Sequence, residues 1–221
     1  CPPPEINILE IVRIIPRRFF WEAYKLKLEE LKEKHRGGCS TVRLETCMPR
    51  KRRGVLHWNE VFLWHGCSPA VGACIAHNGI DPRLAGMRHG KMFGQGVYFA
   101  EHFSKADFYA RPGPCGSAGK CPTKMMLLCL VCLGESFTAT TPMMTLTLPP
   151  CATCRKEVRM ECTCHDKGKS FDSVSGVSRG HGGCVDLPEH IVYAGNQVVP
   201  VAAITYEHVG TCLCAVCCRA K

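Results

Sequence analysis

The sequence predicts an α+β protein whose antiparallel sheet is folded on itself. Short apolar runs bounded by turn residues outnumber the helical segments, the helices are short and fall early in the chain, and no internal repeat is present. With 221 residues, of which 46% are hydrophobic and 21% charged, the chain has the balance of an ordinary globular domain. We therefore expect a single domain over residues 1–221.

The chain opens with a strand and then a helix. Residues 6–15 are rich in β-branched side chains and end at Pro16, which predicts a strand. Residues 17–35 have helical periodicity, and Gly37 and Gly38 end the helix. The apolar face of that helix is formed by Phe20, Tyr24, Leu28 and Leu31.

The later elements follow from the same patterns of apolar runs and turn residues. Further strands are expected over 61–65, 96–100, 125–133, 191–193 and 198–206, and short helices over 68–77 and 103–110. Loops are expected at 81–92 and 111–122, a Thr/Pro/Met-rich stretch at 138–150, and a polar Cys- and Gly-rich stretch at 151–184.

The composition limits the compartments and the partners that are expected for this protein. The longest apolar run, 125–133, is too short to span a bilayer, and no secretory signal is visible. We expect an intracellular protein, nuclear or cytoplasmic, with no membrane partner. The chain starts at Cys1 rather than Met, which favours a piece of a longer protein.

A net charge of +9 favours anionic ligands such as a dinucleotide pyrophosphate. The basic run at residues 50–53 has no interleaved aromatic side chains, so a nucleic-acid partner is not supported.

Polar side chains recur at the ends of apolar strands. His65-Gly66 follows one strand, the run Phe-Gly-Gln-Gly-Val-Tyr-Phe-Ala places Tyr98 on a second, and Glu189 begins a third. Each residue alone is more often structural than catalytic. A His, a Tyr and a Glu at strand edges together form a polar constellation of the kind that binds a sugar.

This ordered combination resembles the catalytic domain of the poly(ADP-ribose) polymerase family, and its tankyrase-like members most of all. The resemblance covers nearly the whole chain in the family's order. It implies the ADP-ribosyltransferase fold, a split antiparallel β-sheet or β-sandwich flanked by short helices. It also implies an enzyme that cleaves nicotinamide from NAD and transfers ADP-ribose to protein acceptors, including itself.

The resemblance assigns roles to five residues. His65 would hold the adenosine ribose, and Gly66 would clamp the nicotinamide amide through its backbone. Tyr98 and Tyr109 would supply the faces against which the nicotinamide ring stacks. Glu189 would be the catalytic carboxylate, and His65, Tyr98 and Glu189 form the family's triad.

Five further positions complete the implied site. Asp81 and Arg83 lie in the loop that resembles the donor-site loop, near adenine and its ribose. Met92 and Lys105 match acceptor-side positions of chain-extending members. Ala106 stands where the family usually has a Ser that donates to the nicotinamide carbonyl, and the loss of one such hydrogen bond costs about 1 kcal/mol.

Several alternatives stay open. Retention of Glu189 favours extension of poly(ADP-ribose), and mono-transfer is the alternative. Ala106 keeps open a catalytically weak or inactive module that binds NAD or ADP-ribose. A zinc-dependent nucleic-acid-binding protein and an RNA-end phosphotransferase using NAD as acceptor are weaker alternatives, since the first leaves the ordered triad unexplained and the second requires an Arg-rich site that is not evident.

The chain holds 18 cysteines, which favours free thiols or zinc in a reducing compartment over disulfides. Tankyrase-like domains carry a zinc site of three Cys and one His before the 125–133 strand. That loop offers only Cys115 and Cys121 here, so the site is not carried over.

A different cysteine cluster lies in a Cys-rich insertion at about 151–167, and a Cys-rich tail follows at 210–221. The candidate metal ligands are Cys151, Cys154, Cys162 and Cys164, whose spacing permits a shared tetrahedral ion. A mobile, Cys-biased loop is the preferred interpretation, and zinc binding is the alternative.

Overall fold

The computed structural model describes residues 5–42, 44–45, 58–84, 92–110, 123–158, 162–164 and 169–209. The strands, in chain order, are β1 (Ile6–Arg13), β2 (Glu60–Cys67), β3 (Val97–Ala100), β4 (Lys124–Cys132), β5 (Ser136–Ala139), β6 (Ser173–Gly176), β7 (Glu189–Val192) and β8 (Val198–His208). They form one eight-stranded sheet in the order β1-β8-β4-β2-β3-β7-β6-β5. The loop at 111–122 and the tail at 210–221 lie outside the described residues.

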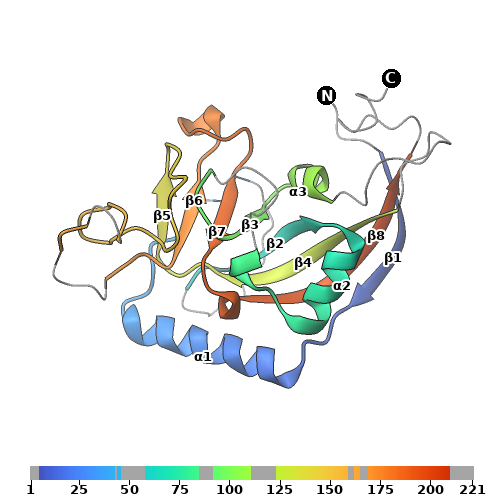
Figure 1. Ribbon diagram of the computed structural model, residues 1–221, viewed down its shortest axis with the longest axis horizontal. Coiled ribbons are helices and arrows are strands. Elements are labelled where there is room, and N and C mark those ends of the chain that lie inside the picture. The colour runs from blue at the N-terminus through green and yellow to red at the C-terminus, as the bar shows by residue number, and fades with distance from the viewer. Residues whose placement is uncertain are drawn as a thin grey trace.

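The sheet is nearly divided between β2 and β3. These strands pair at a single position, Trp64 with Ala100, whereas β2 pairs with β4 over its full length. Beyond this division β7, β6 and β5 stand steeply across the direction of β4 and β8 (Figure 1). The expected α+β fold with a split sheet is therefore confirmed. The pairing differs from the expectation in one place, because β5 and β6 run parallel.

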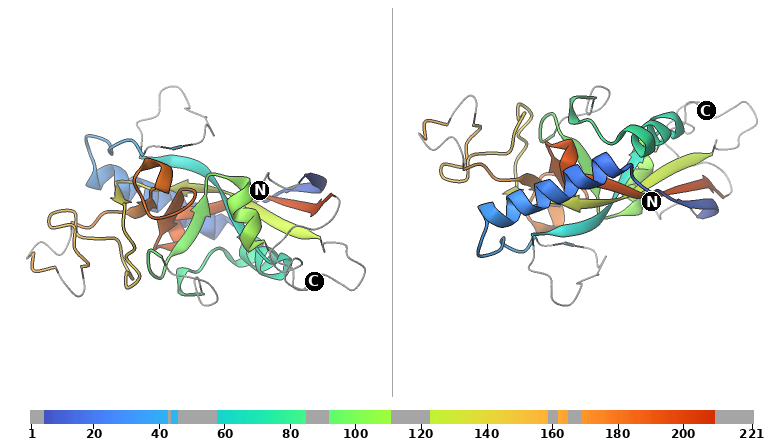
Figure 2. Two further views of the ribbon diagram at one scale, coloured as in Figure 1. Left: turned by 90° about the horizontal axis from the view of Figure 1, so that it is seen from above. Right: turned by 90° about the horizontal axis from the view of Figure 1, so that it is seen from below.

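Helix α1 (Arg18–Lys34) lies across the strands, in front of the sheet when the protein is viewed from below (Figure 2). Its apolar face buries Tyr24 and Leu31 in a cluster with Trp58 and Val199. The Tyr24 hydroxyl donates to Glu60 Oε1 at 2.7 Å, which ties the helix to the start of β2. The helical periodicity thus predicted both the helix and the face that it buries.

Helix α2 (Pro69–Asn78) follows β2 directly. The Ser68 hydroxyl caps its first turn by accepting from the backbone N–H of Val71, and Pro69 occupies the first helical position, where a missing N–H costs little. Gly79, with φ of 74°, ends the helix in a conformation that glycine adopts without strain. Helix α3 (Phe103–Tyr109) follows β3 and packs on β2.

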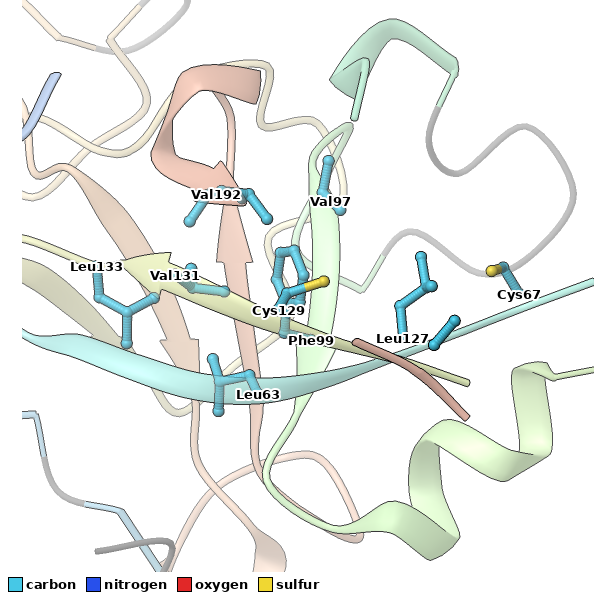
Figure 3. Close-up of a cluster of buried hydrophobic side chains, with 11 residues drawn as sticks. Leu63, Cys67, Val97, Phe99, Leu127, Cys129, Val131, Leu133 and Val192 are labelled. Atoms are coloured by element: carbon cyan, nitrogen blue, oxygen red, sulfur yellow. The ribbon is translucent and has the colours of Figure 1, made fainter. Parts of the chain in front are cut away.

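The main core lies where β2, β3, β4 and β7 meet. Leu63, Phe99, Cys129 and Val192 from these four strands converge in one buried cluster (Figure 3). This cluster spans the division of the sheet, so apolar packing compensates for the missing backbone pairing between β2 and β3.

Two strands were not among the expected elements. β5 begins just before the Thr/Pro/Met-rich stretch, and β6 has the sequence Ser-Val-Ser-Gly, which carries little β propensity. Both owe their conformation to neighbouring strands rather than to their own composition. Short 3-10 helices, η1 (Pro82–Leu84), η2 (Arg179–His181) and η3 (Gly195–Gln197), complete the described elements.

Candidate NAD site at the division of the sheet

The expected triad residues lie on the three strands that meet where the sheet divides. His65 is on β2, Tyr98 on β3 and Glu189 on β7, and these strands are consecutive in the sheet. Ala100 pairs with Trp64 on one side and with Glu189 on the other. The register therefore places Glu189, the first residue of β7, next to the single pair that joins β2 and β3. Residues far apart in sequence are therefore brought to one region.

His65 bridges the two halves of the sheet. Its Nδ1 lies 3.0 Å from the backbone carbonyl oxygen of Tyr98, which fixes Nδ1 as the donor in the neutral ring. Burial lowers the pKa of His65 below its usual range, and the Tyr98 hydrogen bond opposes this only in part. A neutral imidazole bonded through Nδ1 leaves Nε2 as a hydrogen-bond acceptor, which suits a ribose hydroxyl.

Tyr98 is held by two backbone groups. Its hydroxyl donates to the Gly94 carbonyl oxygen at 2.8 Å and accepts from the Phe93 N–H at 2.9 Å. Burial raises the pKa of Tyr98, the Phe93 hydrogen bond opposes the rise, and the charges of Glu189 and Tyr109 add to it. The two hydrogen bonds to Gly94 and Phe93 therefore fix the Tyr98 ring in position.

Glu189 forms an ion pair with Lys105 of α3. Lys105 Nζ lies 2.8 Å from Glu189 Oε1, and the two side chains are 13% and 10% exposed. The same ammonium donates to the carbonyl oxygen of Leu187. Two contacts to the chain around β7 therefore hold the carboxylate in one orientation while Oε2 makes no ion pair among the described residues.

Gly66 lies directly against α3. A Cβ at this position would stand 1.8 Å from the carbonyl oxygen of Ala106 and 3.2 Å from the backbone nitrogen of Ala110. No side chain fits in that space, so a glycine is required for the close approach of helix and strand. The backbone of Gly66 is consequently the part of this residue that a ligand can meet.

Ala106 belongs to the core rather than to a polar pocket wall. It is 2% exposed and packs in a cluster with Ala100, Ala110 and Met126. Its methyl group offers no hydrogen bond. The carbonyl of the same residue approaches Gly66, so Ala106 contributes to the site through its backbone position.

The next residue, Asp107, anchors α3 to strands β4 and β8. Its Oδ1 accepts from Lys124 at 2.8 Å, from the Tyr206 hydroxyl at 2.7 Å and from His208 Nε2 at 3.0 Å. Burial alone would raise the pKa of Asp107, but these donors outweigh it and the pKa is lowered. The network fixes the helix that carries Lys105 and Tyr109.

The other expected residues are on α3, on η1 and in the segment before β3. Tyr109, at the end of α3, is 40% exposed, as a ring that stacks on a ligand requires. Arg83 in η1 pairs with Asp81 through both carboxylate oxygens, and this exposed pair lowers the pKa of Asp81. Met92 is partly buried, and its carbonyl accepts from the Met143 N–H at 2.8 Å. Residues 85–91 of the donor-like loop lie outside the described part of the chain.

A buried polar chain behind β7 was not expected from the sequence. His190 Nε2 lies 2.9 Å from Glu101 Oε1, and His190 Nδ1 lies 2.9 Å from Ser175 Oγ. Ser175 Oγ in turn lies 2.7 Å from Ser136 Oγ. These groups tie β7, β6 and β5 to the end of β3. The signal that sequence reasoning passed over was the polar His190 directly after Glu189, in a strand that is otherwise apolar.

Four sulfur atoms form a second cluster away from the triad. Cys151, Cys154, Cys162 and Cys164 place their Sγ atoms within 4.8 Å of one another, so they could hold a metal ion. Backbone N–H groups of Cys154 and Thr153 lower the pKa of the Cys151 thiol to about 6. The preferred interpretation, a mobile Cys-biased loop, stays a prediction, and the closeness of the four thiols favours the zinc alternative.

The fold and the site define a class of protein, the ADP-ribosyltransferase-fold domains with a split sheet. The model of the poly(ADP-ribose) polymerase catalytic domain matches residues 8–206, from β1 to β8. The chain belongs to this family.

Three relatives illustrate the match. A poly [ADP-ribose] polymerase tankyrase of Caenorhabditis elegans is 30% identical over 170 residues, which are 67% of this chain and 7% of the relative. Poly [ADP-ribose] polymerase 2-B of Oryza sativa subsp. japonica is 43% identical over 79 residues (35% and 12%), and poly [ADP-ribose] polymerase 2 of Zea mays is 40% identical over 79 residues (35% and 11%). The chain thus matches a small fraction of the length of these relatives. None of the described helices has the length and apolar composition that crossing a bilayer requires.

Proposed function

We propose that this domain cleaves nicotinamide from NAD and transfers ADP-ribose to protein acceptors, including its own chain. The observation that carries the proposal is the Glu189 carboxylate, which is on the strand that pairs with the strand of Tyr98 and lies 2.8 Å from the Lys105 ammonium. Family membership supports the same reaction class.

The reaction breaks the bond between C1′ of the ribose and the nicotinamide nitrogen. The electron pair of that bond leaves with nicotinamide, and positive charge builds on the sugar. A fixed carboxylate stabilises this charge without reorganising, which is why its orientation matters. Glu189 also accepts a hydrogen bond from the 2′-hydroxyl of that ribose. The acceptor nucleophile then bonds to C1′ and loses its proton.

Four residues position the dinucleotide. His65 Nε2 accepts a hydrogen bond from the adenosine ribose, and the backbone N–H and carbonyl of Gly66 pair with the carboxamide of nicotinamide. Tyr109 stacks on the nicotinamide ring, and Tyr98 forms the opposite wall. Holding both reacting partners in this way converts a bimolecular step into an effectively intramolecular one.

The remaining proposed residues contact the adenine end of NAD and the acceptor. Asp81 and Arg83 lie on the adenine side, where the exposed Arg83 guanidinium offers donors to an anionic or ribosyl group. Met92 and Lys105 lie on the acceptor side. Retention of Glu189 favours chain extension, so the product is poly(ADP-ribose). A denaturing gel separates the outcomes, because polymer gives a smear and mono-transfer gives one sharp labelled band.

A second candidate function is recognition of NAD or ADP-ribose without turnover. The buried methyl group of Ala106 favours it, since no hydroxyl is available there to hold the nicotinamide carbonyl. A nicotinamide-release assay separates the two functions. Release above the rate in buffer supports the enzyme, and its absence together with saturable NAD binding supports the binding module.

The deciding experiment is autolabelling with radiolabelled NAD in the wild type, Glu189→Gln and Glu33→Gln. Glu33 is an exposed residue of α1 far from the triad and serves as the matched control. We expect Glu189→Gln to lower labelling about 10²–10³-fold with NAD binding retained, and Glu33→Gln to leave it unchanged. Equal labelling by wild type and Glu189→Gln would end the assignment.

A further inference from the structure

We propose that Cys151, Cys154, Cys162 and Cys164 bind one structural zinc ion, and that the resulting knuckle holds residues 143–158 against the loop that fixes Tyr98. The proposal is independent of the transferase activity, because it concerns a separate cluster of thiols and is measured by metal content. It also differs in place from the 111–122 loop, whose residues lie outside the described part of the chain.

The distances between the sulfur atoms fit a tetrahedral ion. Four Zn–S bonds of about 2.3 Å separate neighbouring sulfurs by about 3.8 Å. All four Sγ atoms lie within 4.8 Å of one another, and those of Cys154 and Cys162 are 3.5 Å apart. A disulfide requires a separation of about 2.0 Å, so no pair in the cluster is bonded. All four cysteines are free thiols.

Two turns create this arrangement. In the first, the Arg155 N–H donates to the Cys151 carbonyl oxygen at 2.9 Å, and Arg155 adopts the left-handed conformation with φ of 61°. This conformation is strained for a residue other than glycine. It occurs where the turn places the thiols of Cys151 and Cys154 side by side. At the second pair, the Cys162 N–H donates to the Glu157 carbonyl oxygen at 2.9 Å, which ties Cys162 to the segment that carries the first pair.

Apolar packing does not explain the close approach of the four thiols. Among described residues 151–158 and 162–164, the buried side chains are those of Cys151 and Glu157, while Ala152 is exposed and Val158 is half-buried. The segment therefore has no apolar core of its own. Small segments of this kind are commonly held by a metal ion with four protein ligands.

The cluster is connected to the candidate NAD site by a chain of hydrogen bonds. Glu157 Oε2 accepts from the Thr145 hydroxyl at 2.7 Å. The next residue, Leu146, accepts from the Gln95 N–H at 2.7 Å through its carbonyl oxygen. Gly94, beside Gln95, packs so closely on Leu146 that a Cβ would lie 2.0 Å from the Leu146 oxygen. The Gly94 carbonyl is the acceptor for the Tyr98 hydroxyl.

The cluster is also attached to the sheet on its other side. Cys151 forms an isolated antiparallel bridge with Ser170, and the Ala152 N–H donates to the Lys169 carbonyl oxygen at 2.7 Å. The chain reaches β6 three residues after Ser170. An ion at the four thiols would thus fix the two ends of the insertion, far to the left of α2 in Figure 1, to the β5–β6 edge.

The first test is metal content by mass spectrometry of protein purified under reducing conditions without a metal-affinity tag. We expect about one zinc ion per chain in the wild type, and a loss of about nine-tenths of it in the Cys154→Ser/Cys162→Ser double variant. Cys74→Ser is the control, because Cys74 is an exposed free thiol on α2, and it should keep its zinc. Wild-type protein without zinc, or a double variant with full zinc, would overturn the site.

A second test uses only the wild-type chain, so it does not depend on whether a variant folds. Alkylation with mass-spectrometric mapping should label Cys74 and spare the four cluster cysteines until a chelator is added. Labelling of the four before chelation, or a disulfide among them, would also overturn the proposal.

The positioning role has its own measurement. Chelation should increase hydrogen exchange at residues 93–95 and 143–146 while leaving exchange in β4 unchanged. Unchanged exchange at 93–95 and 143–146 would mean that the ion orders only the insertion. It would overturn the proposed role of the ion in positioning Tyr98. Neither result depends on NAD cleavage, so a failure of the transferase proposal is distinguishable from a failure of this one.

Discussion

The ammonium group of Lys105 lies 2.8 Å from Oε1 of Glu189, and it also donates to the backbone of Leu187 two residues earlier. The two charged residues are on different elements, α3 and β7, and strands β4, β5 and β6 lie between these elements along the chain. Helix α3 thereby sets the direction in which the proposed catalytic carboxylate points. The position of α3 is in turn set by Gly66 and Asp107.

Replacing Lys105 tests whether orientation of the carboxylate matters. We expect Lys105→Met to lower kcat roughly tenfold or more with a smaller change in KM, since a misplaced group costs rate more than binding. Lys105→Arg retains the charge and should recover part of the rate. The measurement is steady-state nicotinamide release at several NAD concentrations. A rate unchanged in Lys105→Met would show that the ion pair has no role in turnover.

The partly buried position of His65 predicts a pH dependence of stability. Its folded pKa lies below the usual 6.5, so as the pH falls below about 6.5 the unfolded chain binds a proton that the folded chain does not. Stability is lost at no more than about 1.4 kcal/mol per pH unit until the folded pKa is reached, and the loss then stops growing.

The comparison that isolates this effect is between the wild type and His65→Asn, which retains a donor to the Tyr98 carbonyl without titrating. Denaturant unfolding at about pH 7.5 and about pH 5.5 should show a smaller acid-induced loss in the variant. Equal losses in both proteins would contradict a depressed pKa at this position.

The contact between Gly66 and α3 predicts that no side chain is tolerated at position 66. A Cβ there would lie 1.8 Å from the Ala106 oxygen, so Gly66→Ala must displace the helix or the strand. We expect a loss of about 1–3 kcal/mol, or about 2–10 °C in Tm, and weakened NAD binding. Gly37→Ala is the control, because nothing lies within 4 Å of its added Cβ. Thermal unfolding of both variants decides the point.

The anchor of α3 predicts a larger cost at Asp107. Asp107→Ala leaves the buried Lys124 ammonium without its carboxylate, and such a loss costs about 3–5 kcal/mol. Asp186→Ala, which removes an exposed pair with Arg179, should cost less than about 1 kcal/mol. Because the pKa of Asp107 is lowered below its usual 3.8, its contribution is present above that pH and is lost as the pH falls through the folded value.

Much of the architecture followed from local patterns. The apolar face of α1 and the bounds of α2, β4 and β8 are confirmed within a residue or two of the expected ones. β5 and β6 were missed because their strand conformation depends on partners distant in sequence. Ser173, for example, pairs with Ser136 on one side and Val192 on the other.

The site was predictable in its residue types but not in its contacts. The strand-end positions of His65, Tyr98 and Glu189 pointed to one region, yet nothing local predicts that Lys105 pairs with Glu189 or that Gly66 meets Ala106. The thiol cluster shows the same limit. Its closeness depends on the left-handed turn at Arg155, and cysteine spacing does not encode that conformation.

The single rung between Trp64 and Ala100 has a mechanical consequence. Between β2 and β3 this is the one backbone pairing that joins the half carrying His65 to the half carrying Glu189. An apolar core and side-chain bonds complete the connection, among them Ser173 Oγ to the Leu133 carbonyl and Gln197 Nε2 to the Asp172 carbonyl. A dinucleotide that contacts both halves therefore adds a further connection where the sheet has a single residue pair. A ligand that binds the folded chain and not the unfolded one stabilises the fold by an amount that grows with its concentration, so occupancy and folding are coupled.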